Sequence, residues 1–317
     1  MSIPSCFYGR GVGREEALRL ALHASEDELL AGATALREAA FGRKVELCAI
    51  INARSGNCGM DCHFCSQSRH NRTPVPAFPL LSEAELRERL RALEHLPLRH
   101  VGIVTSGGLL AGEELESLVR TLETLPPSWQ GRVCGSLGRL PQESLARLRD
   151  AGLTRFHHNL ETAEEYYPRV CTTQRWQDRL STVRRARTTG LEVCSGGLFG
   201  MGESWEQRID FALRLRDEGI LHIPVNFLHP HPGTPLGALP PLDAAAALRI
   251  VAVLRHVLPT ATLRICGGRP TVLGQRQRDM FAAGANALMT GDYLTTAGKA
   301  LEDDCALIAG LGLEIAA

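Results

Sequence analysis

The sequence has no excess of charge of either sign and no long apolar segment. Its 317 residues include 35 basic and 35 acidic side chains, so no overall field favours nucleic acid or an anionic membrane surface. It has no run of about 18 apolar residues and no N-terminal apolar segment typical of secretion. We therefore expect a cytoplasmic protein that acts on a small molecule, with neither nucleic acid nor a membrane as partner.

Cysteine, in contrast, is abundant. The chain has 10 cysteines, and in a reducing compartment clustered cysteines more often bind metals or act in catalysis than form disulfides. Cys58, Cys62 and Cys65 fall on one short stretch directly after the apolar run 45–51. Structural zinc usually takes four ligands, whereas three thiols on a loop can hold a [4Fe–4S] cluster with one iron left open. We expect such an open site here.

Histidines offer an alternative set of metal ligands. His63 or His70 could complete a zinc site with the three cysteines. His229 and His231 could also bind a metal, although their proline-rich surroundings are more typical of a polar loop.

The chain alternates short β-branched runs with amphipathic helical stretches. Strands are predicted at 45–51, 100–105, 132–137, 154–160, 191–198, 221–228, 262–266 and 286–289, and helices at 82–94, 113–124, 141–151, 175–189, 204–218, 242–256 and 272–283. This alternation predicts an α/β fold, a TIM-type (β/α)₈ barrel, closed or partly open. Two short helices within 13–41 predict an N-terminal extension, residues 1–43, before a barrel with a C-terminal helix, residues 44–317.

Loops that follow the strands of such a barrel form its catalytic face. The three-cysteine loop follows the first strand and therefore lies on this face. The Pro- and Gly-rich segment 229–241 follows the sixth strand, and Gly267-Gly268-Arg269 follows the seventh, where it would shape the mouth of the substrate site.

The spacing CxxxCxxC after the first strand resembles the radical S-adenosylmethionine (SAM) superfamily. Within it, the chain resembles the biotin synthases between about residues 45 and 297, in the segments Ser66-Gln67-Ser68, His158-Asn159-Leu160-Glu161-Thr162, Val193-Cys194-Ser195-Gly196-Gly197, Gly200-Met201-Gly202-Glu203, Pro224-Val225-Asn226, Gly233-Thr234-Pro235-Leu236 and Gly284-Ala285-Asn286. Another enzyme of this group, a methylornithine synthase or a hydrogenase-maturation type, is the nearest alternative. A non-catalytic iron–sulfur protein is the alternative from a different class.

The resemblance implies conversion of dethiobiotin to biotin by a 5′-deoxyadenosyl radical, with sulfur from an auxiliary iron–sulfur cluster and no residue acting as acid or base. It assigns Cys58, Cys62 and Cys65 to the [4Fe–4S] cluster and Asn159 and Asn226 to the substrate. It assigns SAM to Ser106, Gly107, Gly108, Glu161, Arg179, Gly200 and Glu203. It further implies a flavodoxin- or ferredoxin-type electron donor and a homodimer.

Several of these residues also have simpler interpretations. Gly107-Gly108 fits a tight turn, and Arg179 fits a solvated charge on a helix. Asn159 and Asn226, taken singly, fit caps or turns.

The auxiliary cluster is where the sequence departs from the better-known pattern of the family, a [2Fe–2S] cluster held by three cysteines and one arginine. Cys134, Cys194 and Arg264 match three of these positions, but Gly102 stands where the second strand should supply a cysteine. Cys266 follows Arg264 by two residues, so both should face the same side of the sheet.

Three thiolates suit a four-iron cluster with one corner not held by cysteine better than a [2Fe–2S] rhomb, which takes four protein ligands. We therefore expect a four-iron auxiliary cluster on Cys134, Cys194 and Cys266, with the transferable sulfur at its free corner. Arg264, which stays protonated, would then neutralise charge. The alternative is that these cysteines are small buried hydrophobic residues. The sequence assigns no function to Cys6, Cys48, Cys171 or Cys305.

Overall fold

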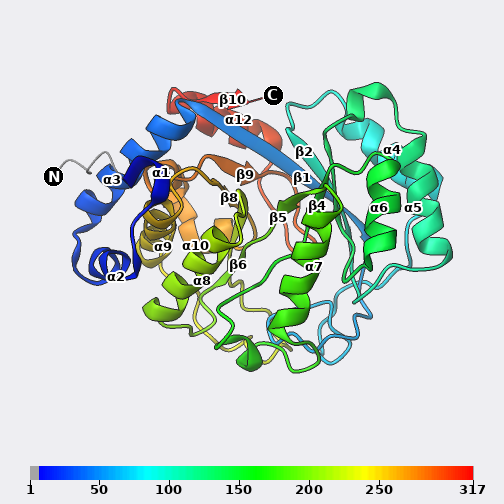
Figure 1. The fold of residues 1–317 in the computed structure, drawn as a ribbon, viewed down its shortest axis with the longest axis horizontal. Coiled ribbons are helices and arrows are strands. Elements are labelled where there is room, and N and C mark those ends of the chain that lie inside the picture. The colour runs from blue at the N-terminus through cyan, green and yellow to red at the C-terminus, as the bar shows by residue number, and fades with distance from the viewer. Residues whose placement is uncertain (1–6, 317) are drawn as a thin grey trace.

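A computed structural model describes residues 7–316, so Cys6 lies outside the described residues. Eight parallel strands form a barrel that closes where the first strand pairs with the last (Figure 1). In barrel order they are β1 (Lys44–Arg54), β2 (His100–Thr105), β3 (Val133–Ser136), β4 (Arg155–His157), β5 (Glu192–Cys194), β7 (His222–Phe227), β8 (Thr262–Ile265) and β9 (Ala287–Met289). The predicted TIM-type fold is confirmed, in its closed form.

Two further strands extend this sheet. The predicted strand 191–198 is divided into β5 and β6 (Gly197–Phe199), and β6 pairs with β7. The chain is crowded at the division, since a Cβ atom on Gly196 would lie 2.0 Å from the carbonyl oxygen of Pro224. A strand that the sequence did not predict, β10 (Glu314–Ala316), pairs with the start of β1.

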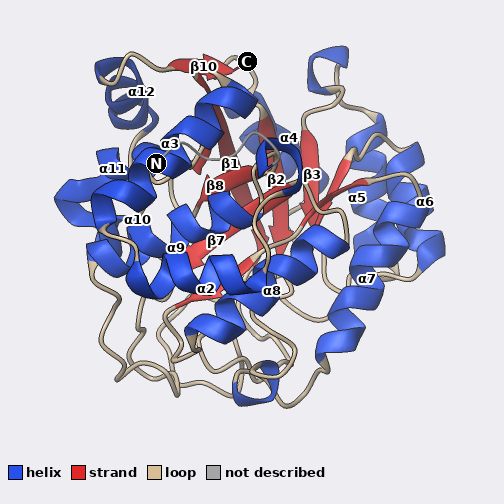
Figure 2. Ribbon diagram, turned by 60° about the vertical axis from the view of Figure 1, so that its left-hand side comes forward, coloured by secondary structure: helices blue, strands red, loops and turns tan. Residues whose placement is uncertain are grey.

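Helices surround the strands (Figure 2). They are α1 (Phe7–Arg10), α2 (Arg14–His23), α3 (Glu26–Phe41), α4 (Glu83–Leu93), α5 (Glu113–Glu123), α6 (Gln142–Asp150), α7 (Trp176–Thr188), α8 (Trp205–Asp217), α9 (Ala244–Val257), α10 (Arg269–Leu273), α11 (Asp279–Ala282) and α12 (Leu301–Gly310). Short 3₁₀ turns lie at Pro127–Trp129, Tyr167–Arg169 and Gly274–Arg278. Among residues 7–316, none of the helices combines the length and apolar character needed to span a bilayer.

Local sequence explains where several helices begin and end. Ser82 and Glu85 form a reciprocal capping box at the start of α4. The single helix predicted at 272–283 is wrong, because the chain there forms α10, a 3₁₀ turn and α11. Gly274, with φ of +49°, ends α10 in a backbone conformation that a continuing right-handed helix does not allow.

The N-terminal helices pack against the outside of the barrel. Helix α3 contacts α9, and α2 contacts both α8 and α9. Arg249 of α9 donates to the carbonyl of Ala24 at 2.9 Å and so satisfies an acceptor at the end of α2. The division into an extension, 1–43, and a barrel, 44–317, stays a prediction.

The strand register determines how the inward side chains stack. Cα partners around the barrel are Cys48–His100, Gly102–Cys134, Cys134–Arg155, Arg155–Glu192, Cys194–His222, His222–Thr262, Arg264–Ala287 and Ala287–Glu46. Followed from pair to pair around the barrel, the register moves forward by two residues along each of β2, β5, β8 and β1. These four shifts add up to a shear number of about eight, which is typical of TIM-type barrels. Inward side chains of alternate strands therefore share layers.

A buried ion pair fixes α12 against the end of the barrel. The two terminal guanidinium nitrogens of Arg269, Nη1 and Nη2, donate to the Asp304 carboxylate at 2.7 and 2.9 Å, and the two side chains are 0% and 2% exposed. Removing one partner of such a pair leaves a buried charge unpaired, at a cost of about 3–5 kcal/mol.

We expect Asp304→Ala to lower the free energy of unfolding by about this amount, about 3–5 kcal/mol, in urea titrations. Asp303→Ala, one residue earlier on the exposed face of α12, is the matched control and should change the free energy little. Equal losses in the two variants would contradict this role for the pair.

Candidate active site

The three-cysteine loop begins after β1 and is shaped by hydrogen bonds within the chain. The N–H of Cys58 donates to the carbonyl of Gln67 at 3.0 Å. The Asn71 side chain donates to the carbonyls of Cys62 and Cys65, at 3.1 and 2.8 Å. The Gln67 carbonyl and the Asn71 side chain therefore fix the backbone of the three cysteine residues. The sequence analysis assigned this role to neither residue.

The predicted metal ligands do not converge on one point. Among residues 7–316, no three His, Cys, Asp or Glu side chains converge closely enough to hold one metal ion. In an iron–sulfur cluster, each iron takes one thiolate. The His70 ring contacts the Gly59 carbonyl at 3.1 Å, and His229 and His231 contact Thr271 Oγ1 and the Pro232 carbonyl, both at 2.9 Å.

Burial affects how readily these thiols ionise. It raises the pKa of Cys65 to about 11. A hydrogen bond with Cys171, together with burial, raises the pKa of Cys62. Both thiols therefore favour the neutral form unless a cation compensates the charge of the thiolate. Bound iron supplies such a cation. The residues present thus fit an iron–sulfur cluster, whose iron ions compensate the thiolates.

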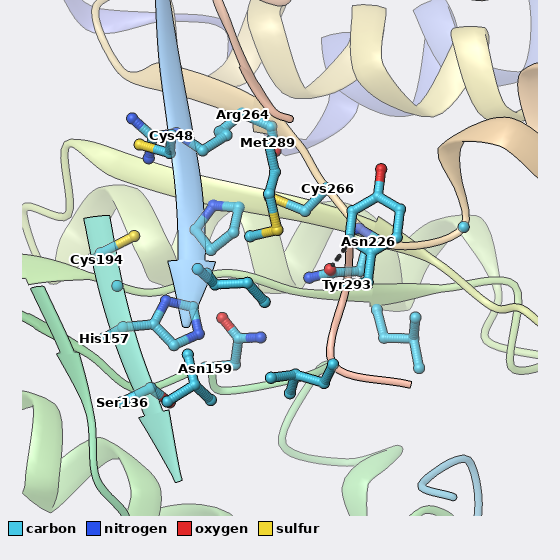
Figure 3. Close-up of a pocket in the computed structure, with 18 of the residues that line it drawn as sticks. Cys48, Ser136, His157, Asn159, Cys194, Asn226, Arg264, Cys266, Met289 and Tyr293 are labelled. Atoms are coloured by element: carbon cyan, nitrogen blue, oxygen red, sulfur yellow. Dashed lines mark hydrogen bonds between the residues drawn. The ribbon is translucent and has the colours of Figure 1, made fainter. Parts of the chain in front are cut away.

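A cavity of about 390 Å³ extends from this loop into the barrel lumen (Figure 3). Phe64 and Ser66 line it on the loop side. Farther inside, apolar side chains such as Ile50, Leu198 and Met289 line it. Among them lie polar and thiol side chains on the strands or just after them, namely Cys48, Cys134, His157, Asn159, Glu161, Cys194, Asn226, Arg264 and Cys266. The cavity therefore brings the cysteine loop, both predicted substrate asparagines and the predicted auxiliary-cluster residues into one space.

Glu161 and Arg179 form a pair beside this cavity. Glu161 has φ of +71°, which is unusual for a residue with a side chain. Arg179 donates to Glu161 Oε1 at 3.3 Å, to the Asn159 carbonyl at 2.9 Å and to the Tyr167 hydroxyl at 2.7 Å. Burial raises the pKa of Glu161, and Arg179 opposes this shift. Arg179 is buried and bonded, so its interpretation as a solvated charge is wrong.

The two asparagines bridge strand ends and also face the cavity. Asn159 accepts from the Gly196 N–H at 3.1 Å and donates to Glu161 at 3.4 Å. Asn226 accepts from the Gly267 N–H at 3.0 Å and donates to the Gly197 carbonyl at 3.1 Å. An amide group has two donors and two acceptor sites, so each side chain keeps one of each for a ligand.

The glycine turn after β2 lies beside a second hollow. Ser106, Gly107 and Gly108 line it, together with Arg54 and Gly59 near the start of the cysteine loop. Gly107 has φ of +97°, and a Cβ atom there would lie 2.8 Å from Arg54 Nη2. The position thus requires glycine both for its backbone angle and for its contact with Arg54.

The Glu203 carboxylate organises its own loop. It accepts from the N–H groups of Gly200 and Met201, both at 2.8 Å, and from Arg208 Nε at 2.8 Å. The side chain is buried, and Gly200 has φ of +95°. These contacts occupy both carboxylate oxygens with protein groups.

The deep end of the cavity combines thiols with a buried arginine. Arg264 Nη2 donates to Glu46 Oε2 at 2.7 Å. Arg264 and Cys266 both line the cavity, which confirms the prediction that they face the same side. In Figure 3 the Arg264 side chain extends toward Cys48, with Cys194 at the same end of the cavity.

Cys48 is the lumen residue that sequence reasoning missed. It lies on β1, where the sequence assigned it no function, yet it lines the cavity with Cys134, Cys194 and Cys266. Burial raises the pKa of all four thiols, and Arg264 opposes the shift in each. Alternation along β1 does not single Cys48 out, because Cys48, Ala49 and Ile50 all line the cavity.

The closed barrel and the cysteine loop after its first strand define a radical SAM enzyme. The Radical SAM superfamily model matches residues 53–215, which include the loop. The model of the Biotin and Thiamin Synthesis associated domain matches residues 224–314.

The chain belongs to the biotin synthase family, radical SAM enzymes that insert sulfur. The biotin synthase of Desulfovibrio desulfuricans is 61% identical over 300 residues, which cover 95% of each chain. Solved structures of methylornithine synthase (TM-score 0.83, 19% identity, 98% of this chain and 96% of that one) and of the [FeFe]-hydrogenase maturase HydG (TM-score 0.82, 16% identity, 98% and 74%) share the fold. At such identities the likeness concerns the fold alone.

The lumen also makes the stability of the protein depend on pH. Desolvation lowers the pKa of His157 on β4 from 6.5 to about 4. Between these values the unfolded chain binds a proton that the folded chain does not, so the free energy of unfolding falls as the pH falls through this window. His100 and His222, whose pKa values are lowered to about 2 and about 3, act in the same direction.

We expect His157→Asn in cluster-free protein to show a smaller loss of unfolding free energy between pH 6.5 and about 4 than the unsubstituted chain, measured in urea. The exposed His23→Asn is the control and should leave the pH dependence unchanged. If the two variants have the same pH dependence, His157 does not contribute in this way.

Proposed function

We propose that the chain converts dethiobiotin to biotin, with the radical SAM cluster on Cys58, Cys62 and Cys65. The observation that carries this proposal is that one cavity is lined by Phe64 and Ser66 of the cysteine loop, by Asn159 and Asn226, and by the lumen thiols. When bound, the loop cluster and SAM supply a 5′-deoxyadenosyl radical that removes hydrogen from an unactivated carbon, and an auxiliary cluster supplies sulfur. The chain's own residues bind and orient the reactants, and none acts as an acid or base.

The SAM site in this proposal combines the Glu161–Arg179 pair with the glycine turn. The Glu161 carboxylate would accept hydrogen bonds from the two ribose hydroxyls, and Arg179, 3.3 Å away, favours its ionised form. Ser106, Gly107 and Gly108 would present backbone groups to the methionyl moiety, because glycine permits close approach. Gly200 and Glu203 would contribute by shaping the loop next to the adenine, since Glu203 binds that loop's backbone.

The substrate site in this proposal consists of the two asparagines. The ureido ring of dethiobiotin is neutral and offers both donors and acceptors. Asn159 and Asn226 each retain one donor and one acceptor after their bonds to the protein. Because those bonds fix both amide groups to strand ends, the side chains would be oriented before the substrate binds.

The auxiliary cluster in this proposal is held by Cys134, Cys194 and Cys266 and is of the four-iron type. Gly102 supplies no thiol, so the better-known ligand set of a [2Fe–2S] cluster is incomplete in this chain. Arg264 is protonated and already paired with Glu46 at 2.7 Å, which suits a counter-charge better than an iron ligand.

We also propose the remaining assignments that the resemblance implies. These are a flavodoxin- or ferredoxin-type electron donor, a homodimer, a cytoplasmic location and the absence of nucleic-acid and membrane partners. The balance of 35 basic and 35 acidic residues supports the last of these.

Anaerobic turnover with dethiobiotin, SAM and a reductant tests the function. We expect biotin and 5′-deoxyadenosine to form together, and Cys58→Ala to abolish both, because the loop cluster loses a ligand. Cys305→Ala on α12, outside the cavity, is the matched control and should retain both products. Deoxyadenosine without biotin would contradict the substrate assignment and leave the radical SAM class intact.

Iron and sulfide counts with Mössbauer spectra on reconstituted protein test the auxiliary cluster. We expect signals of two four-iron clusters in the unsubstituted chain and loss of the lumen cluster's signal in Cys266→Ala, with the loop cluster unchanged. A clean [2Fe–2S] signature that persists in Cys266→Ala would overturn the four-iron assignment.

A further inference from the structure

Four lumen residues occupy one layer of the barrel. Cys48, Cys134, Cys194 and Arg264 lie on β1, β3, β5 and β8, which are alternate strands in barrel order. When the Cα pairs are followed from one of these residues to the next around the barrel, the register shifts by two residues each time. The shift from Arg264 back to Cys48 is also two residues. In a barrel with a shear of about eight, this offset places inward side chains of alternate strands at one level. Cys48 is therefore the layer partner of two predicted cluster cysteines.

The neighbouring positions leave room and add one more thiol. Cys266, two residues after Arg264, belongs to the next level on the same side of the barrel. Gly102 lies on β2, the strand between β1 and β3, and pairs in register with Cys134. It has no side chain to fill the space beside Cys134. A Cβ atom at Gly102 would lie 3.3 Å from Ile50 Cγ2, so a larger residue there would require Ile50 to move.

The charges around this layer favour an anionic occupant. Arg264 is 3% exposed, and its Nε is buried without a hydrogen-bond partner among residues 7–316. Arg155, also 3% exposed, lines the same cavity and contacts the rings of His100 and His222 at 3.2 and 3.1 Å. Each guanidinium group pairs with one carboxylate, Arg264 with Glu46 at 2.7 Å and Arg155 with Glu192 at 2.6 Å, so the unpartnered Arg264 Nε is the donor left for an anionic group in the lumen. An iron–sulfur cluster with thiolate ligands is such a group.

A purely structural role explains Cys48 less well. A buried cysteine that acts as a small hydrophobic residue would have apolar neighbours. Cys48 instead has the Arg264 side chain extending toward it (Figure 3), and it shares its layer with two further thiols.

We propose that Cys48 is the fourth protein thiol ligand of the auxiliary cluster, in place of the thiol that Gly102 does not supply. This inference rests on the proposed function, because it assigns a ligand to the cluster proposed there. Thiols on β1, β3, β5 and directly after β8 approach the lumen from four sides, which suits the four corners of a cubane. The corner that the sequence left without cysteine is then held by Cys48. The transferable sulfur would be one of the cluster's own sulfides.

The test uses the full chain with the loop cluster removed by Cys58→Ala, Cys62→Ala and Cys65→Ala, so that all remaining iron belongs to the lumen. In this background, Cys48→Ala, Cys48→Ser and the control Cys305→Ala are reconstituted anaerobically with iron and sulfide. We expect Cys48→Ala to lose about one iron in four, or more, and to change the Mössbauer spectrum, because one corner loses its ligand. Cys48→Ser should retain more iron with an altered spectrum, since its oxygen is a different ligand, and Cys305→Ala should match the parent.

The outcomes separate this inference from the proposed function. Iron, sulfide and Mössbauer spectra in Cys48→Ala identical to those of the parent would overturn the ligand role of Cys48 and leave the auxiliary cluster in place. A parent without lumen iron would overturn the auxiliary cluster itself, and the Cys48 assignment with it. Circular dichroism spectra and urea unfolding midpoints of Cys48→Ala that match those of the parent exclude loss of the fold as the cause of a lower iron content.

Discussion

The pairing of β1 with β9 is the constraint on which the site depends, because it closes the sheet. An open sheet would leave its inner face to solvent, whereas a closed barrel with fixed shear forces the inward side chains of alternate strands into shared layers. Residues as far apart in sequence as Cys48 and Arg264 become neighbours for this reason. The catalytic loops depend on the same closure, since all eight strands deliver their carboxyl ends to one rim. Phe64 and Ser66 of the three-cysteine loop and the lumen thiols therefore line one cavity.

Charge is the second constraint, and it follows from the first. Once the lumen is closed, Arg264 and Arg155 are removed from water. Within residues 7–316 each pairs with one carboxylate, that of Glu46 and that of Glu192 respectively. Burial alone would keep the lumen thiols neutral, as the raised pKa values of Cys134 and Cys266 indicate. Iron ligation reverses this preference, because a metal-bound thiol is deprotonated. Burying either a charged guanidinium group or a thiolate alone is thus unfavourable. Around an iron–sulfur cluster, the thiolates would bind iron and the guanidinium groups would face the negative charge of the cluster.

Most of the barrel could be predicted from sequence, because strand and helix periodicities are local signals. The three-cysteine loop could be predicted for the same reason, since its ligands lie close together in the chain. The errors have physical causes that are not local. The helix predicted at 272–283 is interrupted at Gly274, and the run 191–198 is divided where Gly196 approaches Pro224. Cys48 was missed because its partners are set by register across the sheet, which a single sequence does not contain.

The fold alone does not determine what the radical attacks, since solved proteins with different names share this barrel. What distinguishes this chain is the lining of its lumen, where each group limits what can bind. The bridging bonds of Asn159 and Asn226 hold two amide groups toward the cavity, so a ligand with a complementary planar polar group gains most there. The deeper layer offers the buried Arg264 Nε, which has no hydrogen-bond partner among residues 7–316, to an anionic or acceptor group. The asparagines and the lumen thiols thus lie at different depths of one cavity, as the proposed sulfur insertion would require.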